Sequence, residues 1–246
     1  MTMKAFVFGA TMMLMAANTA AAQDASWTYS TTIYGWIAGM DTAVETDFGS
    51  IGTEVSFDDI LSNLDMVFMG SLEARRDRLG FVADLVYLDL SNEQNTPLAL
   101  FGSAKVDVSA TILSGYALYR VTTDSSAAVD LGAGFRSFDL DLDLAVSSGD
   151  LPGFSQSVGG SWVDPVIAAR VAVPVSEAWT LTGFADWGGS GGGEQTWQVF
   201  GSAKYAINEK WSTQIGYRHM EVSKELDGRD VDLQISGPVV AVAFKF

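Results

Sequence analysis

The fold is decided by the stretch SGPVVAVAFKF, residues 236–246. Successive side chains of a β-strand point to opposite faces, so alternation along the chain indicates which face meets an apolar environment. From Pro238 onward, one face of this stretch carries only apolar side chains, while the other mixes small apolar residues with Lys245. A strand of this kind is typical of a transmembrane β-barrel, which presents one face to lipid and the other to its own interior. The apolar face consists of Pro238, Val240, Val242, Phe244 and Phe246.

Nine further stretches upstream alternate in the same way, and the links between them are alternately long and short. Outer-membrane barrels have short periplasmic turns and longer extracellular loops, so this pattern predicts an all-β, antiparallel, up-and-down transmembrane barrel of ten strands with both ends in the periplasm. Counts of eight and twelve are the alternatives; twelve would follow if a hairpin of 42–48 and 51–57 reached the membrane. We expect the crossings at 27–38, 64–76, 79–91, 104–120, 127–143, 162–174, 179–188, 195–207, 211–225 and 231–246.

The distribution of charges supports these faces. In the crossing at 162–174, Val163, Ile167 and Val171 share a face, and Asp164 and Arg170 lie on the other. A charged side chain that faces lipid at mid-bilayer costs about 2–4 kcal/mol for Arg or Lys, which explains this separation. We expect a charged lumen in which the groups neutralise one another; a narrow path for small polar solutes is the alternative. The predicted lumen residues are Asp65, Glu73, Arg75, Asp84, Asp107, Asp130, Arg136, Asp164, Arg170, Asp186, Lys204 and Arg218.

An acidic ladder interrupts this pattern in the crossing at 127–143. Asp139, Asp141 and Asp143 have the same parity as Val129 and Phe135, which should face lipid. Either the crossing is complete before the ladder begins, or a β-bulge exchanges the two faces. Carboxylates of this kind could bind Ca²⁺ or bridge divalent ions to lipopolysaccharide, but a solvated acidic face is the expected state.

The first residues are typical of a secretory signal peptide. Lys4 precedes an apolar run at 5–17, and Ala20, Ala21 and Ala22 provide the small residues of a cleavage site. We therefore expect a signal peptide at 1–22 and one barrel domain at 23–246, located in a bacterial outer membrane after export through the periplasm. The formal charge of −16 excludes a nucleic-acid partner, and the absence of cysteine excludes thiolate metal sites.

A short helix is predicted in the first extracellular loop. Ser56 can cap a turn that continues into an apolar stripe of Ile60, Leu61 and Leu64. The helix could fold inward as a plug or seal the extracellular rim.

Catalytic motifs are weak in this sequence. His219, the only histidine, shares a strand face with Glu221 and Ser223, which invites comparison with the triad of outer-membrane lipid A deacylases. Three neighbours on one strand rarely form a triad, and their order and spacing differ from that motif. Omptin-type proteases carry an Asp two positions before the catalytic His, where this chain has Tyr217. We expect no catalytic residues, no metal site and no cofactor.

The chain contains FDDILSNLD at 57–65, EARRDRLGFVADLVYLDLS at 73–91, WVDP at 162–165, DWGG at 186–189, IGYRHMEV at 215–222 and the final SGPVVAVAFKF. These motifs resemble those of porin-like outer-membrane β-barrel proteins of Gram-negative bacteria. Such families are defined by architecture, so the resemblance implies a barrel and no catalytic residues. It also implies that Phe244 and Phe246 act as the assembly signal, and that the partners are outer-membrane lipid, lipopolysaccharide and the barrel-assembly machinery. The leading hypothesis is a structural or narrow-pore role; an outer-membrane enzyme acting on lipid or envelope substrates and a secreted soluble ligand-binding barrel are the alternatives.

Overall fold

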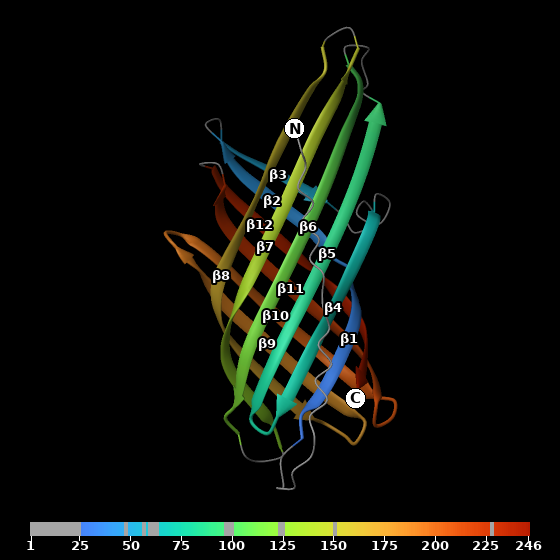
Figure 1. Ribbon diagram of the computed structural model, residues 1–246, viewed down its shortest axis with the longest axis vertical. Helices are drawn as coiled ribbons and strands as arrows, with labels where there is room; N and C mark the ends of the chain where they lie inside the picture. The colour runs from blue at the N-terminus through green and yellow to red at the C-terminus, as the bar shows by residue number, and fades with distance from the viewer. Residues whose placement is uncertain are drawn as a thin grey trace, which may run out of the picture.

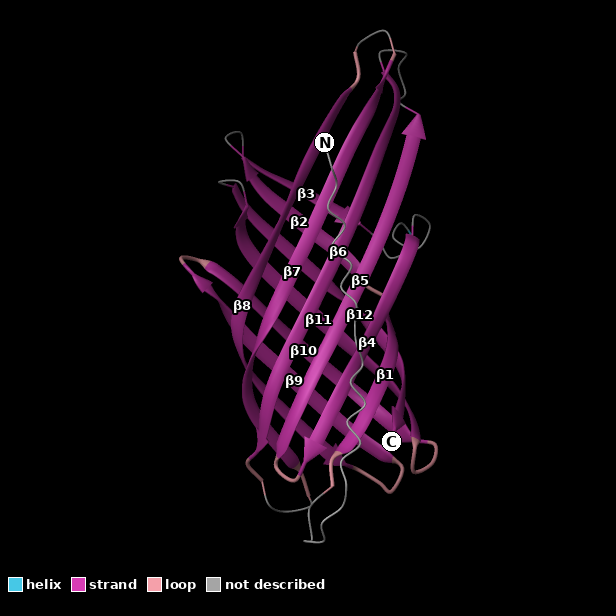
Figure 2. Ribbon diagram, viewed as in Figure 1, coloured by secondary structure: helices cyan, strands magenta, loops and turns pink. Residues whose placement is uncertain are grey.

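The computed structural model describes residues 26–46, 49–55, 58, 64–95, 101–122, 126–149, 152–226 and 229–246. Its strands form one antiparallel sheet (Figures 1 and 2). No helix in the described part of the chain is long and apolar enough to cross a membrane. The strands are β1 (Thr28–Trp36), β2 (Gly39–Thr46), β3 (Gly49–Val55), β4 (Leu64–Arg76), β5 (Leu79–Asn95), β6 (Phe101–Arg120), β7 (Ala128–Ser148), β8 (Phe154–Pro174), β9 (Trp179–Gly191), β10 (Glu194–Ala206), β11 (Trp211–Leu226) and β12 (Arg229–Lys245).

The sheet closes on itself through β1, which pairs with β12 on one side and with β4 on the other. Together with the neighbouring pairs from β4 to β12, this makes a closed barrel of ten strands, as predicted. Each of these ten strands pairs with a neighbour on both sides, so the barrel wall has no unpaired strand edge in the membrane. The alternative of eight strands is therefore wrong.

The predicted hairpin in the first long loop is present as β2 and β3. It does not raise the barrel count to twelve, because β2 continues the register of β1 along β12 beyond the point where β1 ends. Trp36 is opposite Val239, and Gly39 is opposite Ser236. The hairpin therefore extends one side of the wall above β1.

The two ends of the barrel differ mainly in how far the strands extend, because each end has a two-residue link, 77–78 at one and 192–193 at the other. The links 77–78, 175–178 and 207–210 are short, and they lie at the same end as the start of β1 and the finish of β12. Asp77 adopts a φ of 50°, which closes the two-residue turn between β4 and β5. At the opposite end, β5 to β8 rise well beyond the rest of the barrel (Figure 1). In the predicted orientation, these long strands are extracellular.

The outer surface is apolar. Ile33 and Ile167 are each 63% exposed, and many large apolar side chains on the other barrel strands are also exposed. In β8, Val163 and Val171 are exposed, whereas Asp164 on the opposite parity is buried, which confirms the predicted faces of this strand. A surface of this kind is suited to lipid and disagrees with a secreted soluble barrel.

The acidic ladder of β7 lies on the outer face without a bulge. The pairing of β7 with β8 keeps one register from Ala128 to Val146, and Asp139, Asp141 and Asp143 are exposed. Because β7 continues to Ser148, the ladder is placed above the crossing, which is the first of the two predicted explanations.

The prediction that Asp107 lines the lumen is wrong. Asp107 is opposite Asp143 in the β6–β7 pair and shares the outward face of the ladder. The Lys105 ammonium, at 2.7 Å, and the Ser91 hydroxyl lower the pKa of Asp107, so it remains charged. A charge that faces outward costs little at this height, because the strand has already left the apolar band.

Other predictions fall where the structure gives no description. The signal peptide at 1–22 and the helix residues Ser56, Ile60 and Leu61 lie outside the described residues. Leu64 is the first residue of β4.

Candidate functional site

A hydrogen-bonded layer of polar side chains crosses the lumen. Arg136 of β7 donates to Asp186 of β9 at 2.6 Å, to Thr196 Oγ1 of β10 at 2.9 Å and to Ser114 Oγ of β6 at 3.1 Å. The Tyr116 hydroxyl of β6 also donates to Asp186, at 2.8 Å. The Arg136 and Asp186 side chains are completely buried, so the ion pair replaces the hydration that each group loses.

The same layer continues to the opposite wall through Arg218 of β11. Arg218 donates to Gln198 Oε1 at 2.8 Å, to Asp84 at 3.2 Å and to the Tyr34 hydroxyl at 3.0 Å. Tyr34 in turn donates to Asp84 at 2.9 Å. Each of the two arginines of this layer thus has one aspartate, and the layer is electrically neutral.

An apolar layer lies directly above the polar layer on the extracellular side. Each of its main members is two positions nearer the extracellular end of its strand than a member of the polar layer, and therefore shares the inward face. The two layers also touch, since the Arg218 guanidinium lies 4.7 Å from the centre of the Trp36 ring. Corresponding pairs are Tyr34 and Trp36, Asp84 and Val86, Ser114 and Ile112, Arg136 and Phe138, and Arg218 and Met220.

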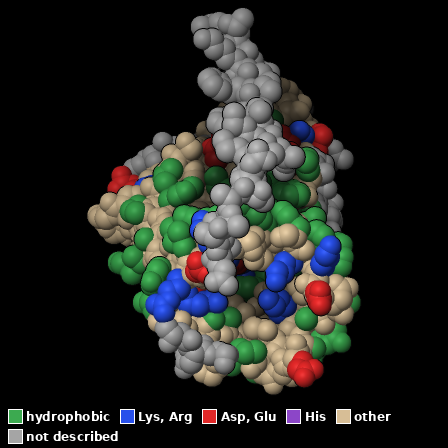
Figure 3. Space-filling view, turned by 60° about the horizontal axis from the view of Figure 1, so that its bottom comes forward, with side chains coloured by type: hydrophobic (Ala, Val, Ile, Leu, Met, Phe, Trp, Pro, Cys, Tyr) green, Lys and Arg blue, Asp and Glu red, His purple; other side chains and the backbone are tan. Residues whose placement is uncertain are grey.

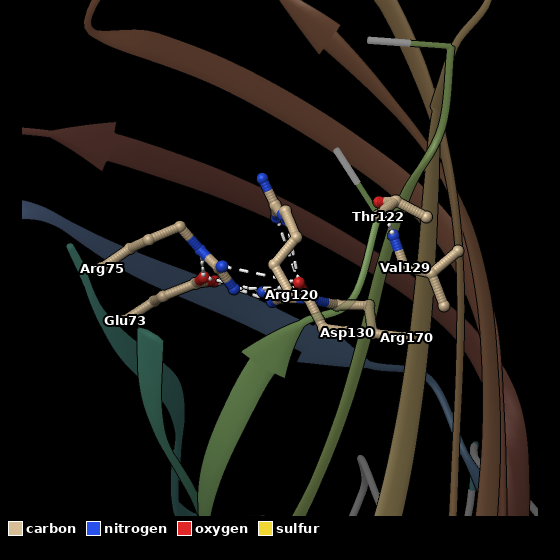
Figure 4. Close-up of polar contacts among 7 residues, drawn as sticks. All are labelled: Glu73, Arg75, Arg120, Thr122, Val129, Asp130 and Arg170. Atoms are coloured by element: carbon tan, nitrogen blue, oxygen red, sulfur yellow. Dashed lines mark hydrogen bonds and ion pairs between the residues drawn. The ribbon is translucent and has the colours of Figure 1, made fainter. Parts of the chain in front are cut away.

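A second cluster of charges occupies the lumen wall on the periplasmic side (Figure 4). Asp130 of β7 accepts hydrogen bonds from Arg75 at 2.9 Å, Arg120 at 2.9 Å and Arg170 at 2.9 Å. Glu73 of β4 accepts from Arg170 at 2.8 Å and from Arg75 at 3.1 Å. The cluster brings together β4, β6, β7 and β8, and it contains three guanidiniums for two carboxylates.

A cavity of about 660 Å³ lies between this cluster and the facing wall. Tyr34, Tyr116 and Arg218 of the polar layer line it at one end, and Lys210 and Lys245 line it at the other. Because the latter two lie beside the short turns, the cavity opens to the periplasmic end; we refer to it as the periplasmic chamber. Lys and Arg side chains gather on this end of the molecule (Figure 3).

The remaining predicted lumen residues lie outside the two clusters. Asp164 is buried above the polar layer, where it accepts hydrogen bonds from Ser190 at 2.5 Å and from Trp162 Nε1 at 3.1 Å. Lys204 lines the mouth of the periplasmic chamber. Asp65 belongs to β4, but its side chain is not described.

The predicted set of charged lumen residues does not include the residues that complete the polar layer or those of the apolar layer. Tyr34, Tyr116 and Gln198 are uncharged and were not singled out by a search for charges. Trp36 and Phe138 have inward parity, so a search for large apolar residues on the charged face of each strand would have found them. Arg120 lies at the end of its strand, yet it has the same parity as Tyr116.

The residues considered for catalysis lie on the outer face of β11 and do not form a triad. The His219 ring is 4.9 Å from the Trp197 ring, and its Nε2 is 4.0 Å from Glu221. The Ser223 hydroxyl donates to Asp232 at 2.6 Å and not to His219. Among the described residues, no group of three or more His, Cys, Asp or Glu side chains has an arrangement suited to a metal ion.

The fold is similar to that of solved outer-membrane proteins. The outer membrane protease OmpT from Escherichia coli superposes with a TM-score of 0.59 at 9% identity, over 90% of this chain and 97% of that one. The chain has the fold of an outer-membrane β-barrel. Neisserial surface protein A gives a TM-score of 0.36 at 14% identity, over 89% of this chain and 97% of that one. Ail of Yersinia pestis gives a TM-score of 0.35 at 9% identity, over 89% of this chain and 98% of that one.

The sequence matches no protein-family model and no curated relative. The similarity to OmpT concerns the fold alone, since identity is only 9%. The predicted location in a bacterial outer membrane agrees with this fold and with the apolar outer surface. The resemblance to a particular porin-like family stays a prediction.

Proposed function

We propose that the protein is a structural outer-membrane β-barrel whose lumen is closed to solutes. The observation that carries this proposal is the stacking of the two buried layers across the lumen. Arg136, Phe138 and Met220 are each 0% exposed, which leaves no room for water beside them. A ten-stranded barrel is only slightly wider than the eight-stranded barrels that side chains fill, so such closure is consistent with its size.

The chemistry of the layers also argues against a narrow pore. A passing ion would have to separate Arg136 from Asp186 or Arg218 from Asp84, and both pairs are held by further hydrogen bonds. It would then meet an apolar layer that offers no replacement for its hydration shell. Side chains of the barrel strands form both barriers.

Planar-bilayer recording with the refolded barrel tests this proposal. The unmodified protein should give no stepwise conductance, whereas a variant with Arg136→Gly, Phe138→Gly and Met220→Gly should conduct. The variant must first show the heat-modifiable migration of a folded barrel, and it proves that the assay can detect an opening. Stepwise conductance of the unmodified protein would instead support the narrow-pore alternative.

In this proposal, the protein has a structural role that depends on the contacts of its outer surface. The apolar outer face contacts membrane lipid, and lipopolysaccharide and the barrel-assembly machinery are the proposed partners. His219 has no catalytic role in this proposal, because the Ser223 hydroxyl is engaged by Asp232.

A further inference from the structure

The net charge of the periplasmic chamber is opposite in sign to that of the whole chain. The whole chain has a formal charge of −16. Of the described residues, seven cationic side chains line the chamber, four arginines and three lysines, together with three carboxylates, those of Glu73, Asp84 and Glu209. With the buried Asp130 included, seven cations face four carboxylates, an excess of three positive charges. Such a concave surface with one dominant sign attracts the opposite charge.

The arginine cluster is incompletely neutralised. Among the residues that the structure describes, Arg75, Arg120 and Arg170 have only Asp130 and Glu73 as ion-pair partners. Their side chains are 17%, 31% and 17% exposed, respectively, so water screens the third positive charge only partly. A buried charge without a partner is costly, and a bound anion would remove that cost. Guanidinium groups also match carboxylate and phosphate oxygens in a bidentate manner.

Lysines line the opposite arc of the chamber. Lys204 of β10, Lys210 of the turn before β11 and Lys245 of β12 all line it. Within the described ranges, none of the three ammonium groups has an ion-pair partner. They therefore attract an anion to the mouth of the chamber without first having to break an existing pair.

The deeper wall between these two groups of cations is apolar. Phe184 of β9, Phe200 of β10 and Val239 of β12 line it, next to Val82 and Leu118. A volume of about 660 Å³ lies within the range of pockets that bind organic ligands, roughly 300–1,000 Å³. An inorganic ion alone would leave this apolar surface uncovered.

We propose that the periplasmic chamber binds a small amphiphilic oxyanion, an apolar group that carries one phosphate or carboxylate. The oxyanion contacts the arginine cluster at Arg120, the most exposed of its three side chains, and the apolar group lies against Phe184 and Phe200. Entry is from the periplasm, because the polar and apolar layers close the other end. The chamber is thus a binding site and not the vestibule of a channel.

Equilibrium dialysis of the full barrel in nanodiscs, with hexyl phosphate as the probe, tests the proposal. Saturable binding of one hexyl phosphate per barrel is expected, weaker at high salt. Arg120→Gln and Lys204→Gln should each raise the Kd by about three- to tenfold, because the first removes a charge-assisted contact and the second removes a cation from the mouth of the chamber. Lys105→Gln, which removes a cation from the far outer face of β6, should leave the Kd unchanged. Empty nanodiscs provide the blank.

Three further probes separate the parts of the proposal. Hexanoate in place of hexyl phosphate shows whether carboxylates are also accepted, and binding of either anion supports the site. Phe200→Ser should weaken hexyl phosphate but not inorganic phosphate. Binding of neither anion, equal binding of hexanol, or an unchanged Kd in the exposed Lys204→Gln variant would overturn the proposal. Because dialysis measures binding and not conductance, the result is independent of whether the lumen conducts.

Discussion

Arg136 and Asp186 form an ion pair of 2.6 Å across the barrel lumen, and both side chains are 0% exposed. They come from β7 and β9, which are not neighbours in the sheet. The second carboxylate oxygen of Asp186 has no hydrogen-bond partner in the described part of the chain, so the interaction with Arg136, Tyr116 and Gln198 is concentrated on one oxygen. The layer across the lumen therefore depends strongly on this pair.

Removal of Asp186 should destabilise the barrel. Asp186→Ala leaves the Arg136 charge buried without a partner, and we expect the free energy of unfolding to fall by about 3–5 kcal/mol. Urea unfolding of the refolded protein in lipid vesicles measures this change. Asp141→Ala, on the exposed ladder, should change it by less than about 0.5 kcal/mol. Equal effects of the two substitutions would show that the lumen pair does not stabilise the fold.

Leu85 tests the lipid-facing register of β5. It lies opposite Gly70 and Leu113 on the outer face, while the adjacent Val86 belongs to the apolar layer. Leu85→Arg should lower the free energy of unfolding by about 2–4 kcal/mol, because a charge enters the apolar band. Ser109 lies on the same face, between Asp89 and Asp141, and Ser109→Arg should be tolerated there. An unchanged unfolding midpoint for Leu85→Arg would refute this register.

Phe246 should direct assembly. Its backbone N–H donates to Tyr29 O at 2.9 Å, the Tyr29 N–H donates back at 3.2 Å, and the two rings are 5.8 Å apart. Deletion of Phe246 removes the last contact of the seam where β12 meets β1, and it also removes the proposed signal. Heat-modifiable barrel in the outer membrane should decrease while export continues. Phe154→Ala, an exposed aromatic in β8, should not have this effect, and a normal level of folded barrel after the deletion would exclude the signal.

The first extracellular loop should not control conductance. Because wall side chains such as Phe138 and Met220 already close the lumen, removing residues 56–63 should leave planar-bilayer recordings silent. Folding of the deletion protein is checked by heat-modifiable migration. The appearance of conductance would establish this segment as a plug and contradict closure by the wall.

The strands and their faces could be predicted from the sequence because alternation is a local property. Val163, Ile167 and Val171 indicate a lipid face within one strand, whatever the rest of the chain does. The order of the links also predicted the ten-strand barrel, but the predicted longer link at 189–194 is shorter in the structure, because β9 and β10 extend until only 192–193 joins them. The outward direction of the Asp139 ladder, however, required the unbroken register of β7 with β8.

By itself, the sequence determined which side chains face inward, because the two-residue period follows from strand geometry alone. Only the tertiary structure decided which of them meet. Glu73 and Arg170 are 97 residues apart, and Asp84 and Arg218 are 134 apart. Their contacts depend on the stagger of strands around a closed barrel, which sets the height of each residue in the lumen. That stagger places one neutral layer beneath an apolar one and leaves three arginines with two carboxylates. Because the stagger is a property of the whole closed sheet, no single strand determines it.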